Sequence, residues 1–235
     1  MAWRQRIQGV YSKIVLVDSG TLGNSWRRRS FATANEEPAD FDGDLLLMCG
    51  TNGEVYFSSG RAISNTKGFY FYSSTDNGES WHVKEVLTGN QYPFRENALG
   101  RAGSGPIFLA WGDSNTTGHN NNYWVDFMRG DNSGESWSEI QSLGDVCQTL
   151  NNKSAMASLG ERIDMVMTGG GSLFLIRSSD GGRNWTYPEF IPGTDFFSSF
   201  FGSPDMVLHP SGKTFLVCEK QSSATDGGLY LLQMQ

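Results

Sequence analysis

Ser74-Thr75-Asp76-Asn77-Gly78-Glu79-Ser80-Trp81 is the stretch that decides the fold, because it recurs as Ser178-Ser179-Asp180-Gly181-Gly182-Arg183-Asn184-Trp185. The spacing predicts a hairpin turn in which the Asp carboxylate accepts hydrogen bonds from backbone amides and Gly supplies a positive φ. The Trp then opens the next strand as a large core anchor. The structural residues of the two copies are Ser74, Asp76, Gly78, Trp81, Ser178, Asp180, Gly182 and Trp185.

Two looser copies extend the repeat. Residues 130–137 keep Asp131, Gly134 and Trp137 as structural residues, but one residue is inserted between Asp and Gly and no Ser stands two before the Asp. Residues 17–26 keep only the Gly-x-x-Trp end. The four Trp residues lie 55, 56 and 48 residues apart, close to the roughly 40–50 residues of a four-stranded propeller blade once loop insertions are allowed. Arg129-Gly130-Asp131 is an integrin-type tripeptide, but we expect the Asp131 carboxylate to turn inward to its own amides.

The pattern Ser-x-Asp-x-Gly-x-x-Trp resembles the Asp box of the sialidase-like (BNR-repeat) β-propellers, and its copies span nearly the whole chain. The resemblance implies an all-β protein, a β-propeller of four-stranded blades in one domain over residues 1–235. Five blades are favoured, at 47 residues per blade, and four are the alternative because residues 44–57 form an extra hairpin. Residues 3–7 look like an outer strand without a partner, so we expect the ring to close by pairing of the N- and C-terminal strands.

Composition limits the partners. The net charge of −7 and the pI near 4.9 argue against nucleic acid or an anionic membrane, since both require a basic surface. The basic run at residues 27–29 is expected on an exposed strand edge. Three cysteines, an odd number, do not indicate a disulfide framework. The N-terminal residues lack a secretory apolar stretch, so the expected protein is soluble, without membrane insertion, and cytoplasmic or on a virion surface.

In the propeller family the box turns lie on one face, and function concentrates on the opposite face, where loops ring the axis. Two of these loops allow two interpretations each. The polar loop around His119 is either a solvated insertion or a sugar-binding loop. Residues 195–201 either fill the core or form an exposed aromatic patch. The candidate ligand-binding residues on the loop face are Tyr92, Arg95, Asp113, His119, Phe196 and Phe197.

The resemblance also raises an enzymatic interpretation. Sialidases hold the substrate carboxylate with three arginines and use a Tyr nucleophile paired with a Glu, plus an Asp acid/base. Their early Phe/Tyr-Arg-Ile-Pro motif has its nearest match at residues 93–96, which keep Phe-Arg and lose Ile-Pro. No second or third arginine follows from a motif, so we assign no catalytic residue. The three histidines show no metal-ligand spacing, and neither a metal nor a cofactor is predicted.

The favoured function is therefore a non-catalytic propeller for recognition, or a structural surface module, with a glycan or a protein surface as partner and oligomers allowed. An acidic propeller of this kind would suit a virion appendage, a decoration protein or a host-attachment protein. The alternative is a compact sialidase-like glycoside hydrolase or lyase acting on a surface polysaccharide. Its candidate carboxylates are Glu36, Glu37, Asp113 and Asp195, and a pair about 5–9 Å apart would favour it.

Overall fold

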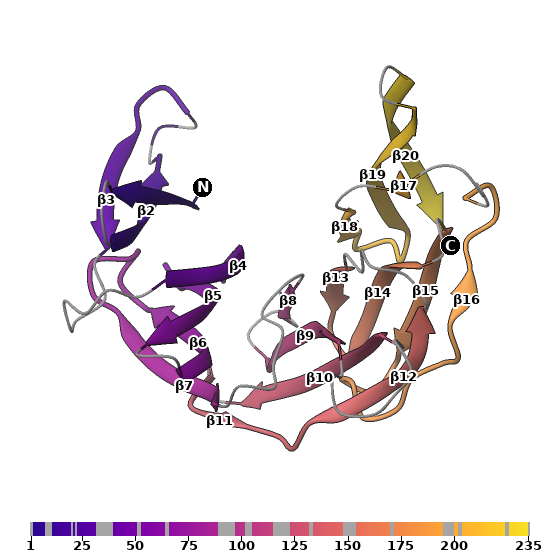
Figure 1. Ribbon diagram of the computed structural model, residues 1–235, viewed down its shortest axis with the longest axis horizontal. Helices are drawn as coiled ribbons and strands as arrows, with labels where there is room; N and C mark the ends of the chain where they lie inside the picture. The colour runs from indigo at the N-terminus through magenta and orange to yellow at the C-terminus, as the bar shows by residue number, and fades with distance from the viewer. Residues whose placement is uncertain are drawn as a thin grey trace. The chain divides into compact units, whose positions relative to one another are not determined.

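The computed structural model is built of antiparallel β-strands (Figure 1). It describes residues 2–7, 11–19, 21, 23–31, 40–50, 53–63, 66–88, 97–101, 105–114, 123–131, 134–147, 154–169, 172–194, 200–201, 204–223 and 226–234. The chain divides into two compact units, Met1–Asn90 and Gln91–Gln235. Among the described residues, no helix is long and apolar enough to cross a membrane.

The N-terminal unit contains two sheets in which strands consecutive in sequence pair with each other. The first sheet consists of β1 (Ala2–Ile7), β2 (Tyr11–Asp18) and β3 (Arg27–Phe31). The second consists of β4 (Asp40–Cys49), β5 (Val55–Ile63), β6 (Thr66–Ser74) and β7 (His82–Thr88).

The C-terminal unit contains three sheets. One consists of β8 (Asn97–Arg101), β9 (Ile107–Ser114), β10 (Tyr123–Asp131), β11 (Ser136–Trp137) and β12 (Gln141–Cys147). The next consists of β13 (Ser154–Leu159), β14 (Arg162–Gly169), β15 (Ser172–Ser178) and β16 (Glu189–Phe190). The last consists of β17 (Phe200–Phe201), β18 (Asp205–Leu208), β19 (Thr214–Ser223) and β20 (Asp226–Met234).

The strand pairing corrects the blade count. Counted over the described residues, four sheets contain four or five strands, as β-propeller blades do, whereas the first sheet has three. The favoured count of five is therefore wrong, and the alternative of four holds. The hairpin at residues 44–57 is not extra, because it supplies β4 and β5 of the second sheet.

The N-terminal strand also differs from expectation. Residues 3–7 were expected to lack a partner nearby in sequence, but β1 pairs with β2 along its full length, from Ala2↔Leu16 to Ile7↔Tyr11. Closure of the ring through the termini stays a prediction, and so does a single domain over residues 1–235.

The core of the C-terminal unit lies between successive sheets. Phe108 and Phe127 of the β8–β12 sheet pack against Met165 of β14, whereas Val166, on the other face of β14, packs against Leu216 of β19. The inner strands β8, β13 and β18 contact one another in succession. The apolar strand β14 thus packs on both of its faces, as strands between two neighbouring sheets do.

Residues 74–81 and 178–185 form two turns of one geometry, called here the first and second acidic turns. The second turn reaches the neighbouring sheet: the rings of Trp185 and Phe127 meet edge to face, with centroids 4.9 Å apart. Gly182 has a φ of 82°, and a Cβ added there would stand 2.5 Å from Cζ of Phe127. Only Gly fits this contact, because any side chain would overlap the Phe127 ring.

Candidate functional site

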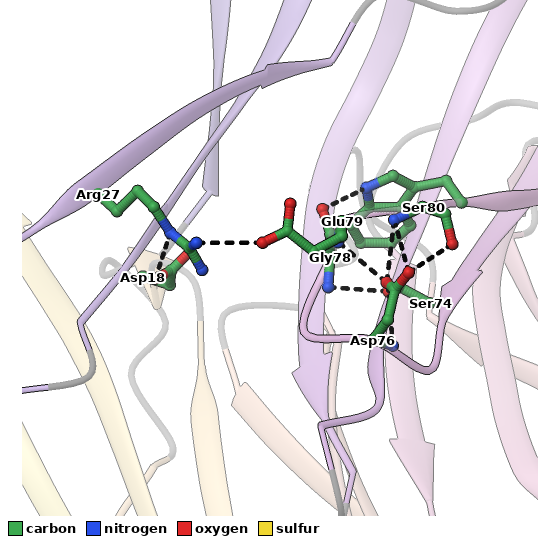
Figure 2. A network of polar contacts seen from close by, with 8 residues as sticks. Asp18, Arg27, Ser74, Asp76, Gly78, Glu79 and Ser80 are labelled. Carbon is green, nitrogen blue, oxygen red and sulfur yellow. Dashed lines mark hydrogen bonds and ion pairs between the residues drawn. The ribbon is translucent and has the colours of Figure 1, made fainter.

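The first acidic turn follows β6 and is closed by its own polar groups (Figure 2). Oγ of the buried Ser74 accepts a hydrogen bond from the Gly78 amide at 2.8 Å and donates one to Asp76 at 2.7 Å. Asp76 also accepts from the backbone amides of Glu79 and Ser80, both at 2.9 Å, and from the Ser80 hydroxyl at 2.6 Å. Hydrogen bonds from Ser80 and Ser74 hold the pKa of Asp76 well below its usual range.

The second acidic turn repeats this network. Ser178 accepts from the Gly182 amide at 2.8 Å and donates to Asp180 at 2.8 Å. Asp180 accepts from the backbone amide and the side-chain amide of Asn184, at 2.9 and 2.6 Å. These bonds lower the pKa of Asp180 to about 2. Both aspartates therefore accept these hydrogen bonds in the ionised form, which suits a structural acceptor.

The third copy of the repeat departs from this geometry. The Asp131 side chain is 60% exposed, and Oδ1 lies 3.4 Å from Nε of Arg129. The expectation that the Asp131 carboxylate turns inward is wrong, because the residue inserted before Gly134 changes the spacing on which the turn depends. Trp137 keeps its place, since its indole N–H donates to the Gly134 carbonyl at 3.0 Å.

The most degenerate copy is more complete than its sequence suggests. Ser19 accepts from the Gly23 amide at 2.7 Å, as Ser74 does from Gly78. Thr21 accepts from the Ser25 amide at 2.8 Å, and the Thr21 and Ser25 hydroxyls lie 2.8 Å apart. Ser19 and Thr21 thus occupy the Ser and Asp positions of the repeat. Sequence analysis missed them because it sought a carboxylate where a hydroxyl stands.

Arg27 joins two parts of the N-terminal unit, as Figure 2 shows. The guanidinium lies 3.3 Å from Asp18 of β2 and 3.0 Å from Glu79 of the first acidic turn. Arg27 and Arg28 are exposed on β3, which is an edge strand of its sheet among the strands that the structure describes. The predicted placement of the basic run on an exposed strand edge is confirmed for these two residues.

The predicted loop-face residues are mostly beyond what the structure describes. Tyr92, Arg95, His119, Phe196 and Phe197 lie outside the described residues, and so do Glu36, Glu37 and Asp195. Asp113 is placed by its backbone, one residue before the end of β9. The described residues nearest to the loop face are therefore those at the ends of the strands.

The ends of β9, β10 and β12 bring together residues that sequence analysis did not combine. β10 runs from Tyr123 to Asp131 of the third turn, so Tyr123 and Trp124 lie at the end away from that turn. Trp124 pairs with Asp113 of β9 on one side and with Asp145 of β12 on the other. One row across the sheet thus reads Asp-Trp-Asp. The sequence alone did not indicate this row, because loops separate its three residues along the chain.

A second row lies two residues further along the same strands. Asn97 of β8 pairs with Trp111 of β9, which pairs with Asp126 of β10. Trp111 and Asp126 are 2% and 7% exposed. By alternation these positions belong to the sheet face opposite the one that packs on β14, where Phe127 lies. The loop-face end of this sheet therefore concentrates two Trp residues and three carboxylate residues.

The fully buried carboxylate of Asp164 lies in an ion-pair cluster between β14 and β19, apart from these two rows. Arg162 donates two hydrogen bonds to it, at 2.9 and 2.7 Å, and the Thr214 hydroxyl of β19 donates a third. Burial raises the pKa of Asp164, but the bonds from Arg162 and Thr214 and the nearby charge of Arg177 outweigh it, so the pKa lies below its usual value. Arg162 also donates to the Gly212 carbonyl at 2.8 Å. This cluster links the sheet that contains β14 to the sheet that contains β19.

No group of three His, Cys, Asp or Glu side chains among the described residues is placed to hold a metal ion.

No protein-family model matches the sequence, and no curated protein matches it. Solved structures do match by shape. A mutant of the NanB sialidase from Streptococcus pneumoniae aligns with 94% of this chain at a TM-score of 0.63 and 17% identity. The fold is a sialidase-like β-propeller.

Two other structures support the same fold. The polysaccharide lyase Uly1 aligns with 99% of this chain at a TM-score of 0.64 and 14% identity. A mutant of the α-L-arabinofuranosidase arb93a from Fusarium graminearum aligns with 96% at 0.64 and 17% identity. This chain spans 35% of the length of the sialidase, 54% of the lyase and 74% of the arabinofuranosidase. The three similar proteins are named for action on glycans.

Proposed function

We propose that this chain is a glycan-recognition β-propeller that binds sugar at the end of the β8–β12 sheet away from the acidic turns. The observation that carries the proposal is the row Asp113–Trp124–Asp145, in which a Trp position stands directly between two Asp positions. An aromatic ring packs on the C–H face of a sugar, and flanking carboxylates accept hydrogen bonds from its hydroxyls. The shared fold of glycan-acting proteins supports the same ligand class.

The expected ligand is a neutral, hydroxyl-rich glycan. The row contains two acidic positions, and the chain has a net charge of −7. Like charges repel, so a sialylated or uronate-rich glycan would need cationic side chains that the row does not supply. Arg95 stays a predicted ligand-binding residue, and its contribution is separable by mutation.

A glycan array followed by calorimetric titration of the best glycan tests this function. Trp124→Ala should weaken binding by at least about tenfold, the loss expected for a central aromatic contact. Trp26→Ala is the matched control, because Trp26 is 56% exposed in the degenerate turn and should leave binding unchanged. Equal affinities for the two variants would contradict the proposed site.

A second function, a glycoside hydrolase or lyase, is favoured by the same row. Asp113 and Asp145 lie on strands that flank β10, so their backbones are two strand spacings, about 10 Å, apart. Inverting glycosidases hold their two carboxylates about 6.5–9.5 Å apart, so the two Asp positions on these strands are the candidate pair. Release of new reducing ends from a bound polysaccharide, lost in Asp113→Asn with binding retained, would establish the enzyme. Binding without turnover in the wild-type protein would establish the recognition module.

A further inference from the structure

Among the described strands, the last sheet of the chain ends in a long edge strand, β20. β17 and β18 both pair with the same edge of β19, and β20 pairs with the other edge. Among the strands that the structure describes, none pairs with the outer edge of β20. This edge is nine residues long, from Asp226 to Met234, and its backbone N–H and C=O groups can pair with another strand.

An exposed apolar patch accompanies the open edge. Leu229 and Leu231 of β20 are 80% and 68% exposed. Val217, which pairs with Leu231 across the sheet, is 40% exposed, and Val207 of β18 is 58% exposed. The opposite face of the same sheet is packed, since Leu216 and Cys218 belong to the core shared with β14 and β15. Both faces of the sheet are therefore apolar, and among the described residues one of them carries the exposed side chains.

The strand lacks the features by which proteins block edge pairing. Lysines, prolines, bulges and inward charges are the usual safeguards. Residues 226–234 contain no Lys, Arg or Pro, and Asp226 is their only charged residue. The irregularity in the β19–β20 ladder lies between Gln221 and Ser223, beyond the apolar segment. The edge is therefore open along Leu229–Leu231, where the patch is most exposed.

We propose that β20 pairs with β20 of a second copy of this chain, antiparallel and about a two-fold axis at Tyr230. In this register Leu229 stands opposite Leu231 of the second copy, and Leu231 stands opposite its Leu229. All nine residues find a partner position, because residues 226 and 234 also pair with each other. The two-fold axis keeps equivalent faces on the same side, so the two apolar patches join into one.

A second copy fits this edge for two reasons. The strand is self-complementary, since antiparallel reversal about Tyr230 places leucine opposite leucine at both exposed positions. The segment is also nearly neutral in a chain with a net charge of −7, so the strand meets its copy with no like charges opposed inside the ladder. Residues 3–7, expected from the sequence to cover this edge, pair with β2 through one edge of β1, so closure by the N-terminal strand is the rival that the test below separates.

Sedimentation equilibrium of the full chain tests the proposal through charge pairs at the two leucines. The wild-type chain should dimerise at micromolar concentration. L229K/L231K places Lys opposite Lys twice across the two-fold axis, whereas L229K/L231E places Lys opposite Glu twice. The dimer dissociation constant of L229K/L231K should exceed that of L229K/L231E by at least about tenfold. Tyr187→Lys, at a residue 91% exposed on another sheet, should dimerise like the wild type.

Circular dichroism and thermal melts of each variant establish that the exposed substitutions leave the fold intact. A monomeric wild-type chain overturns the proposal. The free edge of β20 would then be covered by a strand of the same chain, such as the N-terminal one. Equal dissociation constants for the two double variants overturn the Tyr230-centred pairing. A dimer disrupted by Tyr187→Lys overturns it as well, because the interface would then lie elsewhere.

Discussion

At Gly182, a hydrogen atom in place of a side chain lets the second acidic turn lie against Phe127 of the neighbouring sheet. We expect Gly182→Ala to lower the free energy of unfolding by about 3 kcal/mol: about 1 from the positive φ and about 2 from overlap with the ring. Gly193→Ala is the control, because Gly193 has the same φ of 82° with nothing within 4 Å of an added Cβ. It should lose about 1 kcal/mol. Equal losses in urea denaturation would show that Phe127 does not constrain the turn.

At Thr21 we expect a substitution that raises the free energy of unfolding. Thr21 occupies the Asp position of the degenerate turn and accepts from the Ser25 amide at 2.8 Å. A carboxylate accepts stronger hydrogen bonds than a hydroxyl, so Thr21→Asp should raise the free energy of unfolding by about 0.5–1 kcal/mol. Thr75→Asp, at an exposed position outside the hydrogen-bond network of the first acidic turn, should change it little. A thermal melt measures both, and a destabilised Thr21→Asp would show that the two turns are not equivalent.

At the scale of strands, Asp164 of β14 ties its sheet to β19 through Arg162 and Thr214. The pKa of Asp164 in the folded chain lies below its ordinary value of 3.8. The ionised carboxylate therefore contributes stability that is present above about pH 4 and is lost as the pH falls through the folded pKa. Asp164→Asn removes the negative charge that Arg162 and Arg177 face, and should cost about 2–3 kcal/mol at neutral pH. This is less than for a fully buried pair, because the arginines are 32% and 30% exposed.

Urea midpoints between about pH 5 and pH 2.5 measure this linkage. The midpoint should fall on acidification in the wild type and fall less in Asp164→Asn. Asp205→Asn is the control, because Asp205 is exposed at the start of β18 and accepts from the Met206 amide alone among the described groups. It should follow the wild-type curve. If the urea midpoints of the wild type and Asp164→Asn fell equally with pH, the ionised Asp164 would not contribute to the pH dependence of stability.

At the scale of the whole molecule, both apolar clusters of the C-terminal unit lie within Gln91–Gln235. We therefore expect residues 91–235 alone to fold and to melt cooperatively, because no side chain of either cluster is removed. Residues 154–235 are the control: they lack Phe108 and Phe127, which cover one face of β14, and should remain unfolded. A fragment 91–235 without a cooperative melt would show that its stability depends on the first ninety residues.

The acidic turns were predictable because everything that forms them lies within eight residues. The acceptor, the amides of Ser80 and Glu79 and the positive-φ glycine are set by local spacing, so the repeat predicted both the turns and the propeller fold. The apolar strands were predictable for a similar reason, since a strand buried on both faces is apolar in every register. At Asp131 one inserted residue undid the pattern, and at Thr21 a hydroxyl replaced the carboxylate that the pattern required.

The sequence by itself determined the turn type, the all-β class and the approximate repeat length. The tertiary structure decided which strands are partners: β1 with β2, β4 with β5 within a blade, and β20 with β19. It also placed Trp124 between Asp113 and Asp145, although loops separate the three in sequence. The physical reason is that a hydrogen bond across four residues is fixed by local backbone geometry. A cross-strand partner depends instead on register between distant segments, which packing selects.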